Sequence, residues 1–319
     1  KTTLKEMSGQ LLNKICETYY SEKSYNNKYG IPLSLFNIKK KHRIGIFEVG
    51  MDKKGEISYL TKILQPNIGV ITNISYAHIK NFKNLKGIAE AKSEIIDNIV
   101  KGGTIILNAD DKFFNYFKSK AIANKLKIIS FSQKKKSNVK FHKFKKKGVN
   151  NFIVVKSNEK SLNFLINQEL TNNVDNILAS IAIISNFYDL KKLNLDFFRD
   201  YKIPEGRGDL KLIKIKNKKI NIIDESYNSN PLSLKFALDK FNKLNIPSKK
   251  KVILLGDMLE LGKYSKKLHT EAAKIVNKIN INRVYVYGKN IKNTFNKIRP
   301  QKRGRVLNSK IDILNFLKN

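Results

Sequence analysis

Short runs of apolar residues recur along the chain, and each has the length and composition of a β-strand. They occur at 43–50 (RIGIFEVG), 67–75 (NIGVITNIS), 103–111 (GTIILNADD), 126–132 (LKIISFS), 219–226 (KINIIDES), 251–258 (KVILLGDM) and 283–290 (RVYVYGKN). Most of them are followed by a segment whose apolar residues repeat at helical spacing. Because alternating strands and helices build parallel sheets, the pattern predicts an α/β protein.

Several of these predicted strands end in polar side chains. The residues concerned are Glu48, Thr72, Asn73, Asn108, Asp110, Asp224 and Asp257. In an open parallel sheet, ligands bind in the crevice beyond the carboxyl ends of the strands. We therefore expect the functional site to lie along these strand ends.

A change of pattern near residue 205 predicts the boundary between two domains. The segment 203–213 (IPEGRGDLKLI) contains a proline and two glycines, and it leads into a two-residue alternation of apolar positions. A length of 319 residues is also typical of roughly two domains. We expect one domain over residues 1–205 and a second over residues 206–319.

The second predicted domain begins with two recognisable local structures. The first is a hairpin that turns at 217–219. The second is a helix that has Asn230 as its N-cap and Pro231 in its first position, where a proline loses no hydrogen bond.

The formal net charge of +37 raises the question of nucleic-acid binding. The lysines are spread over the whole chain, and abundant Asn and Ile accompany them, as an AT-rich genome would produce. The basic runs at 134–136 and 145–147 have only Phe141 and Phe144 between them as possible base-stacking residues, so we interpret these runs as the solvated edge of a hairpin. No specific nucleic-acid partner is expected.

The single cysteine, Cys16, has no partner within the chain, which fits a reducing compartment. No stretch reaches the ~20 apolar residues of a membrane span. The first thirty residues also lack the basic and then apolar pattern of a signal peptide. We expect a cytoplasmic protein without a membrane span.

The first residues, Lys1 and Thr2, match the end of the phosphate-binding loop G-x-x-x-x-G-K-[ST]. Such a short match is common among surface residues and has little weight by itself. The following segment, 4–19 (LKEMSGQLLNKICETY), has helical spacing, which would put both residues at a helix N-terminus. Helix N-termini bind anions, so the match gains weight from its context.

The segment 87–100 (GIAEAKSEIIDNIV) predicts a helix with one apolar stripe, formed by Ile88, Ile95, Ile96 and Ile99. Lys92 lies on this stripe, whereas Glu90 and Glu94 do not. A lysine there can extend along the apolar surface and keep its charge in water, which is the commoner case. It can also be desolvated and take part in chemistry. This segment alone leaves both interpretations open.

His78 and Glu48 each follow or close a predicted strand. Taken singly, each is compatible with an ordinary surface or core side chain. Together with Thr2 they offer a hydroxyl, a carboxylate and an imidazole at neighbouring strand ends. This is the kind of set that binds a hard cation beside a nucleoside triphosphate.

Eight ordered segments resemble motifs of the Mur ligases, the amide ligases of peptidoglycan synthesis. They are KTTLKEM (1–7), FEVGM (47–51), ITNISYAHIKNFKNLKGIAEAKSEI (71–95), LNADD (107–111), NNVDNILA (172–179), EGRGDLKLI (205–213), IIDESYNSNPLSLKFAL (222–238) and LLGDMLELGKYSKKLH (254–269). The last two resemble the family member that adds D-alanyl-D-alanine. The others are shared with the whole superfamily, including folylpolyglutamate synthase.

The resemblance implies a central P-loop-type ATPase domain with a parallel sheet, followed by a Rossmann-like C-terminal domain that binds the amine substrate. Mur ligases also have an N-terminal UDP-binding domain. We expect that this chain begins inside the phosphate loop of the central domain, without the loop glycines and without that first domain. ATP binding by the chain would then be weakened.

The resemblance also implies roles for individual residues around the phosphates. Lys1 would hold the β- and γ-phosphates, with Thr2 and Thr3 next to it, and Thr2 with Glu48 would bind a first Mg²⁺. His78 would help to bind a second Mg²⁺. Lys92 corresponds to the lysine that family members carbamylate, which turns an inward amine into an anionic metal ligand.

Further from the phosphates, the implied contacts involve the adenine, the linker and the amine substrate. Asn173 and Asn176 would contact the adenine, and Arg207 and Asp224 would contact the nucleotide from the linker and the C-terminal domain. The candidate contacts to the amine substrate are Tyr227, Asn228 and Asn230.

The implied reaction uses ATP and Mg²⁺ to join D-Ala-D-Ala to UDP-MurNAc-tripeptide. The tripeptide carboxylate attacks the γ-phosphate to form an acyl phosphate, and the amine then displaces phosphate, with Lys1 and Arg207 stabilising the developing charge. Such a ligase serves peptidoglycan synthesis and thereby cell wall biogenesis, cell shape and cell division. The alternatives are another ligase of the Mur and folylpolyglutamate synthase superfamily, a basic nucleic-acid-binding protein, or an inactive fragment of a ligase.

Overall fold

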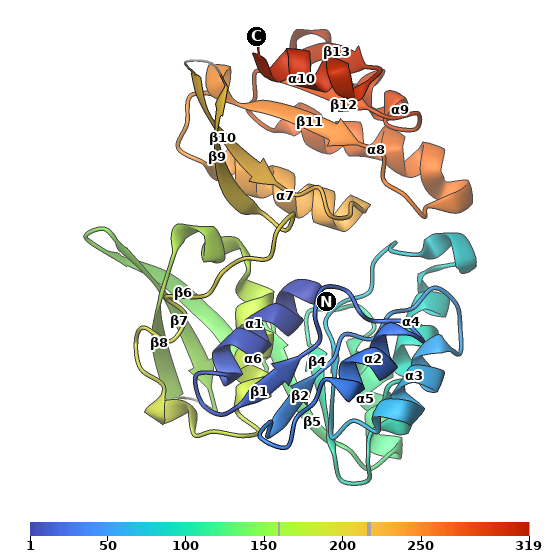
Figure 1. Cartoon of the computed structure of the whole chain (residues 1–319), viewed down its shortest axis with the longest axis vertical. Coiled ribbons are helices and arrows are strands. Elements are labelled where there is room, and N and C mark those ends of the chain that lie inside the picture. The colour runs from blue at the N-terminus through green and yellow to red at the C-terminus, as the bar shows by residue number, and fades with distance from the viewer. Residues whose placement is uncertain (159, 216–217, 319) are drawn as a thin grey trace. The chain divides into compact units, whose positions relative to one another are not determined.

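The computed structural model describes residues 1–158, 160–215 and 218–318. The chain forms two compact units (Figure 1). The first comprises residues 1–74 and 84–203, and the second comprises residues 75–83 and 204–319. The sequence analysis did not foresee that the segment 75–83, which carries His78, belongs with the second unit.

A six-stranded sheet forms the centre of the first unit, in the order β3-β4-β5-β6-β7-β8. Its strands are β3 (Ile68–Ile71), β4 (Thr104–Asn108), β5 (Lys127–Ser132), β6 (Val139–Lys147), β7 (Asn150–Ser157) and β8 (Lys160–Ile166). The pairs from β3 to β6 are parallel, as expected, whereas β6, β7 and β8 pair antiparallel. Strands β6 and β7 are joined by two residues only, 148 and 149, a length that suits a hairpin.

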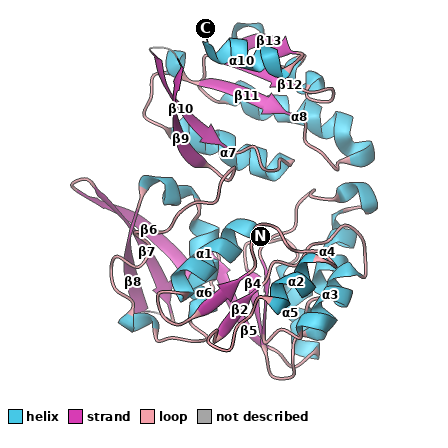
Figure 2. Ribbon diagram, in the orientation of Figure 1, coloured by secondary structure: helices cyan, strands magenta, loops and turns pink. Residues whose placement is uncertain are grey.

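The helices of the first unit are α1 (Thr2–Leu12), α2 (Gly30–Phe36), α3 (Glu56–Leu64), α4 (Leu85–Ser93), α5 (Phe114–Ala123) and α6 (Val174–Ile184), with short 3₁₀ turns at Ile96–Asn98, Gln168–Asn172 and Leu190–Lys192. Helix α6 packs against β4, β5 and β6, and α1 packs against α6 (Figure 2). Met7 and Leu11 of α1 are fully buried in the core that α6 shares with the sheet. Each such side chain contributes about 1.5–3 kcal/mol when removed from water, so α1 is held firmly and its N-terminus has a defined position.

A separate parallel pair, β1 (Thr18–Tyr20) and β2 (Ile44–Ile46), lies beside α1. The predicted strand 43–50 is therefore shorter than expected, since only its first residues pair. Residues 47–51 run on in extended or irregular form, and this stretch carries Glu48.

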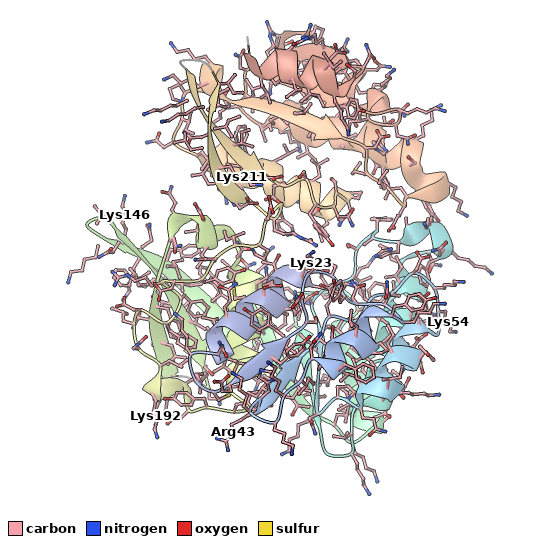
Figure 3. All side chains as sticks on the ribbon, viewed as in Figure 1. Lys23, Arg43, Lys54, Lys146, Lys192 and Lys211 are labelled. Atoms are coloured by element: carbon pink, nitrogen blue, oxygen red, sulfur yellow. The ribbon has the colours of Figure 1, made fainter. Side chains whose placement is uncertain are left out.

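The lysine run 145–147 lies at the exposed end of the β6–β7 hairpin, as interpreted, whereas the run 134–136 lies in the exposed connection between β5 and β6. Residues 143–147 are all exposed, and Lys146 points away from the ribbon near the turn (Figure 3). Phe141 and Phe144 contact one another with ring centroids 5.0 Å apart and ring planes tilted by 57°.

The second unit contains a three-stranded parallel sheet of β11 (Val252–Gly256), β12 (Arg283–Tyr287) and β13 (Arg303–Leu307). Its helices are α7 (Pro231–Lys243), α8 (Ser265–Lys278), α9 (Lys292–Phe295) and α10 (Lys310–Lys318), with 3₁₀ turns at Ile79–Asn81, Ser248–Lys250, Gly262–Tyr264 and Pro300–Lys302. Helices α7 and α8 pack against each other, as do α8 and α9. Parallel strands that alternate with helices agree with the expected α/β class.

The predicted hairpin of the second unit is present as β9 (Asp209–Ile215) and β10 (Lys218–Asp224), which pair antiparallel. The predicted turn was 217–219: residue 217 lies outside the described residues, and residues 218 and 219 already belong to β10. The predicted start of α7 is confirmed, since Asn230 Oδ1 accepts hydrogen bonds from the backbone N–H groups of Leu232 and Ser233. Among the described residues, no helix is both long enough and apolar enough to cross a membrane.

Candidate phosphate and metal site

The N-terminus of α1 has features that favour anion binding. The helix begins at Thr2, and the N-cap position belongs to Lys1, whose side chain has no acceptor with which to cap the first-turn N–H groups. These groups and the positive end of the helix dipole favour a phosphate. The sequence prediction that Lys1 and Thr2 begin a helix is confirmed, and Thr3 follows them half-buried in the first turn.

Thr2 and Glu48, predicted to act together, are in direct contact. Thr2 Oγ1 donates a hydrogen bond to Glu48 Oε2 at 2.6 Å, and both residues are buried. Lys1 Nζ lies 3.8 Å from Glu48 Oε1 and donates to the carbonyl oxygen of Val49 at 3.0 Å. The sequence analysis missed a fourth residue, Asn26, whose Nδ2 donates to Glu48 Oε1 at 2.8 Å.

Glu48 remains ionised in this setting. Burial alone would raise the pKa of its carboxyl group, but the charge of Lys1 and the hydrogen bonds from Thr2 and Asn26 lower the pKa below its ordinary value. An ionised, buried carboxylate next to a hydroxyl and a helix N-terminus is suited to a hard cation that also binds phosphate oxygens.

These oxygen donors fit magnesium better than a metal that needs a complete protein cage. Within residues 1–158, 160–215 and 218–318, no group of three or more His, Cys, Asp or Glu side chains could hold a metal ion. Mg²⁺ commonly uses one or two carboxylates and takes its remaining ligands from water and substrate phosphates. The pair of Thr2 and Glu48 meets that requirement.

Lys92 of α4 reaches the residues that follow β3. Its Nζ donates to the carbonyl oxygen of Asn73 at 2.8 Å. Burial lowers the pKa of the Lys92 amine to about 8, helped by the charge of Lys1 and opposed by Asp111. A lysine that merely extends to water would not lose so much of its basicity.

Glu94 lies beyond the end of the helix in which the sequence pattern placed it. The predicted helix 87–100 ends at Ser93, so helical spacing no longer applies to Glu94, which is buried. Its two carboxylate oxygens accept hydrogen bonds from the backbone N–H groups of Gly55 and Ser58, at 2.8 and 3.0 Å. Glu94 thereby caps the start of α3 and connects it to the helix that carries Lys92.

His78 lies in the second unit and is paired with Glu260, at 2.6 Å between Nδ1 and Oε2. The segment around His78 is held further by a hydrogen bond from Lys80 N–H to the Glu260 carbonyl at 3.1 Å. Gly262 permits this approach, because a Cβ there would lie 2.9 Å from Lys80 Cβ. A histidine whose Nδ1 faces a carboxylate presents Nε2 to a ligand, the arrangement usual for metal-binding histidines.

Asn173 and Asn176 lie one turn apart at the start of α6, both half-buried. Asn176 Nδ2 donates to Asn173 Oδ1 at 3.3 Å, so the two amides share one surface. Asp175, between them, was not predicted as part of the site. Burial raises the pKa of the Asp175 carboxyl group, and Gln133 Nε2 donates to its Oδ1 at 2.8 Å.

The linker residue Arg207 stacks on Tyr227, with its guanidinium carbon 4.0 Å from the ring centroid. The other linker-side candidate, Asp224, is held by Lys211, which is labelled in Figure 3. Asp224 Oδ2 accepts a hydrogen bond from Lys211 Nζ at 3.0 Å. The hydrogen bond from Ser226 lowers the pKa of the Asp224 carboxyl group, and Lys211 adds to this effect.

Among the candidate amine-substrate residues, Tyr227 and Asn228 are exposed, whereas Asn230 is half-buried at the start of α7. Asn230 Oδ1 is already occupied by the two backbone N–H groups that it caps.

Two family models match the chain. Residues 1–184 match the Mur ligase middle domain, and residues 210–314 match the Mur ligase, glutamate ligase domain. Curated relatives with the name UDP-N-acetylmuramoyl-tripeptide--D-alanyl-D-alanine ligase match the chain, and they include proteins from Buchnera aphidicola and Rickettsia prowazekii. The one from Buchnera aphidicola of Acyrthosiphon pisum is 35% identical over 296 residues, covering 90% of this chain and 62% of that protein. The one from Rickettsia prowazekii is 32% identical over 295 residues, covering 90% and 63%.

A solved structure has a similar fold. The crystal structure of MurF from Acinetobacter baumannii is 26% identical, with a TM-score of 0.86 over 99% of this chain and 67% of that chain. The chain thus spans about three fifths of the length of the curated relatives that it matches. Because the middle-domain model matches more than half of the residues of this chain, the chain belongs to the Mur ligase family.

Proposed function

We propose that the protein is the ATP-dependent ligase that joins D-Ala-D-Ala to UDP-MurNAc-tripeptide in peptidoglycan synthesis. Relatives that carry this name match 90% of the chain at 32–35% identity, which supports the choice of substrates. The observation that carries the chemistry is the contact of Thr2 with Glu48 at the N-terminus of α1. An ionised carboxylate, a hydroxyl and a lysine at an anion-binding helix end are the parts that phosphoryl transfer needs.

In this proposal, Lys1 and the first-turn N–H groups of α1 hold the terminal phosphates of ATP, with Thr3 in the same turn. Thr2 and Glu48 would hold Mg²⁺, with His78 as a candidate ligand of a second ion. Magnesium would neutralise charge on the phosphate oxygens. The substrate carboxylate attacks the γ-phosphate, and the acyl phosphate so formed reacts with the amine of D-Ala-D-Ala to give an amide and phosphate.

The remaining candidates have supporting roles in the same proposal. Asn173 and Asn176 bind the adenine, and Arg207 and Asp224 contact the nucleotide. The candidate contacts to the amine substrate are Tyr227, Asn228 and the side-chain amide nitrogen of Asn230. We assign residues 1–205 to the ATP-binding domain and residues 206–319 to the domain that binds the amine.

We also propose that the reaction takes place in the cytoplasm, where ATP is available. A lone thiol, Cys16, suits that reducing compartment.

The test is an assay of phosphate release by the product of the complete gene, with UDP-MurNAc-tripeptide, ATP and Mg²⁺. D-Ala-D-Ala should give much faster release than L-lysine or D-glutamate. Equal or faster turnover with a single amino acid would reject this substrate assignment in favour of another ligase of the superfamily. Absence of amine-dependent phosphate release with every acceptor would reject the ligase activity itself.

A further inference from the structure

Asn26 contacts the candidate phosphate and metal site but has no role in the reaction proposed above. Its Nδ2 donates to Glu48 Oε1 at 2.8 Å, while Thr2 Oγ1 donates to Glu48 Oε2 at 2.6 Å. Each carboxylate oxygen therefore receives a hydrogen bond from a different segment of the chain. We propose that Asn26 is a positioning residue that holds the Glu48 carboxylate in the orientation that binds a divalent cation.

A carboxylate needs such support because its last torsion angle is broad and nearly free. With Thr2 as the only donor, the group could rotate about that bond and present either oxygen. Donors on both oxygens prevent this rotation and leave the unused lone pairs of Glu48 at fixed positions for a cation. Asn26 suits this task, because its amide donates without bringing a second negative charge.

The backbone holds Asn26 against the segment of Glu48. Gly50 N–H donates to the Asn26 carbonyl oxygen at 2.6 Å. A Cβ on residue 50 would lie 2.6 Å from that same oxygen, so only glycine allows the two segments to approach this closely. Because Gly50 is two residues beyond Glu48, this contact sets the distance between the Asn26 amide and the carboxylate.

Lys5 contacts the segment that leads to Asn26. The residue is only 4% exposed, and its Nζ donates to the carbonyl oxygens of Ser21 and, at 2.9 Å, Lys23. Lys5 belongs to α1, the helix that carries Thr2. Both donors to Glu48 are therefore positioned by one rigid helix, Thr2 directly and Asn26 through Lys5.

The neighbouring Asn27 provides a matched control. Its Oδ1 accepts hydrogen bonds from the backbone N–H groups of Tyr29 and Gly30, at 3.0 and 2.9 Å, and so supports the start of α2. If Asn26 only stabilised its loop, removal of either side chain would have the same consequence. If Asn26 positions Glu48, only Asn26→Ala should impair cation binding.

The experiment measures Mn²⁺ binding by electron paramagnetic resonance, with and without ADP, in the product of the complete gene. Wild type, Asn26→Ala and Asn27→Ala are compared, and thermal unfolding of each is recorded. Residues that orient metal ligands typically affect affinity by about 10- to 100-fold, and we expect a loss of this size for Asn26→Ala. Asn27→Ala should keep an affinity close to that of wild type, even if it unfolds at a lower temperature.

The proposal rests on the cation site of the proposed function, and the outcomes separate the two. Unchanged Mn²⁺ affinity in Asn26→Ala, with normal binding by wild type, would overturn the positioning role and leave the site intact. An equal loss in both variants would also overturn it, because the loop would then be the cause. Absence of Mn²⁺ binding by wild type would overturn the cation site itself, and the positioning role with it.

Discussion

Lys92 is predicted to work as a carbamate, and its variants test this directly. The amine points toward the end of β3 and donates to the Asn73 carbonyl oxygen. Only a neutral amine adds carbon dioxide, so the fraction of Lys92 that is neutral decides whether the carbamate can form. Desolvation in the folded protein raises that fraction.

The size of this effect follows from the lowered pKa. At pH 7.5, a pKa of about 8 leaves roughly a quarter of the Lys92 amines neutral, against roughly 0.1% at the ordinary value of 10.5. The structure therefore increases the reactive form roughly 200-fold. Protonation removes the neutral amine of Lys92. Carbamate formation should therefore decline as the pH falls below about 8 and rise as the pH is raised through that value.

Two substitutions distinguish a carbamate from a simple cation. Lys92→Ala should nearly abolish ligation while leaving the fold intact, and added acetate or formate should restore part of the activity by supplying the missing carboxylate. Lys92→Arg should not restore it, because a permanent cation repels the metal ions. The direct readout is the carbamate carbonyl signal in a ¹³C NMR spectrum of wild type supplied with ¹³C-bicarbonate.

Two results would refute this reasoning about Lys92. One is turnover of Lys92→Arg close to that of wild type. The other is an active wild-type enzyme that has no carbamate signal under the conditions of the assay. In either case the lysine acts through its positive charge or its packing.

Two further predictions concern the elements around the site. Glu94→Gln should lower the free energy of unfolding by about 2–4 kcal/mol in chemical denaturation, because a charged acceptor of two backbone N–H groups at the start of α3 is lost; an unchanged midpoint would show that water replaces the carboxylate. Lys211→Met should raise the pKa of the Asp224 carboxyl group toward its ordinary value, as followed by NMR of the carboxyl carbon. Asp224 contributes stability above its unfolded-state pKa and loses it as the pH falls through the lowered value, so the variant should lose that contribution at a higher pH. A titration identical to that of wild type would contradict the role given to Lys211.

Local sequence patterns determined much of this protein. The helix that begins at Thr2, the strands β3, β4, β5, β11 and β12 and the capped start of α7 follow from spacing and capping residues among near neighbours in the chain. The strands β1, β8 and β13 were not predicted. The phosphate-binding role that we propose for Lys1 and Thr2 belongs to this class, because it depends on one helix end and the residues next to it.

Residues remote in sequence determined what these patterns could not predict. The contact of Asn26 with Glu48 joins positions 22 residues apart, and the cap that Glu94 provides to α3 joins positions up to 39 apart. The periodicity of apolar residues does not indicate such pairs, because each pair depends on how α1, α4 and the loops between them pack. The pairing of His78 with Glu260 joins the short segment 75–83 to the middle of the segment 204–319 within the second unit. The sequence determined which side chains could take part in the chemistry, whereas tertiary packing decided which of them meet, because burial and the hydrogen bonds that it requires are properties of the folded chain.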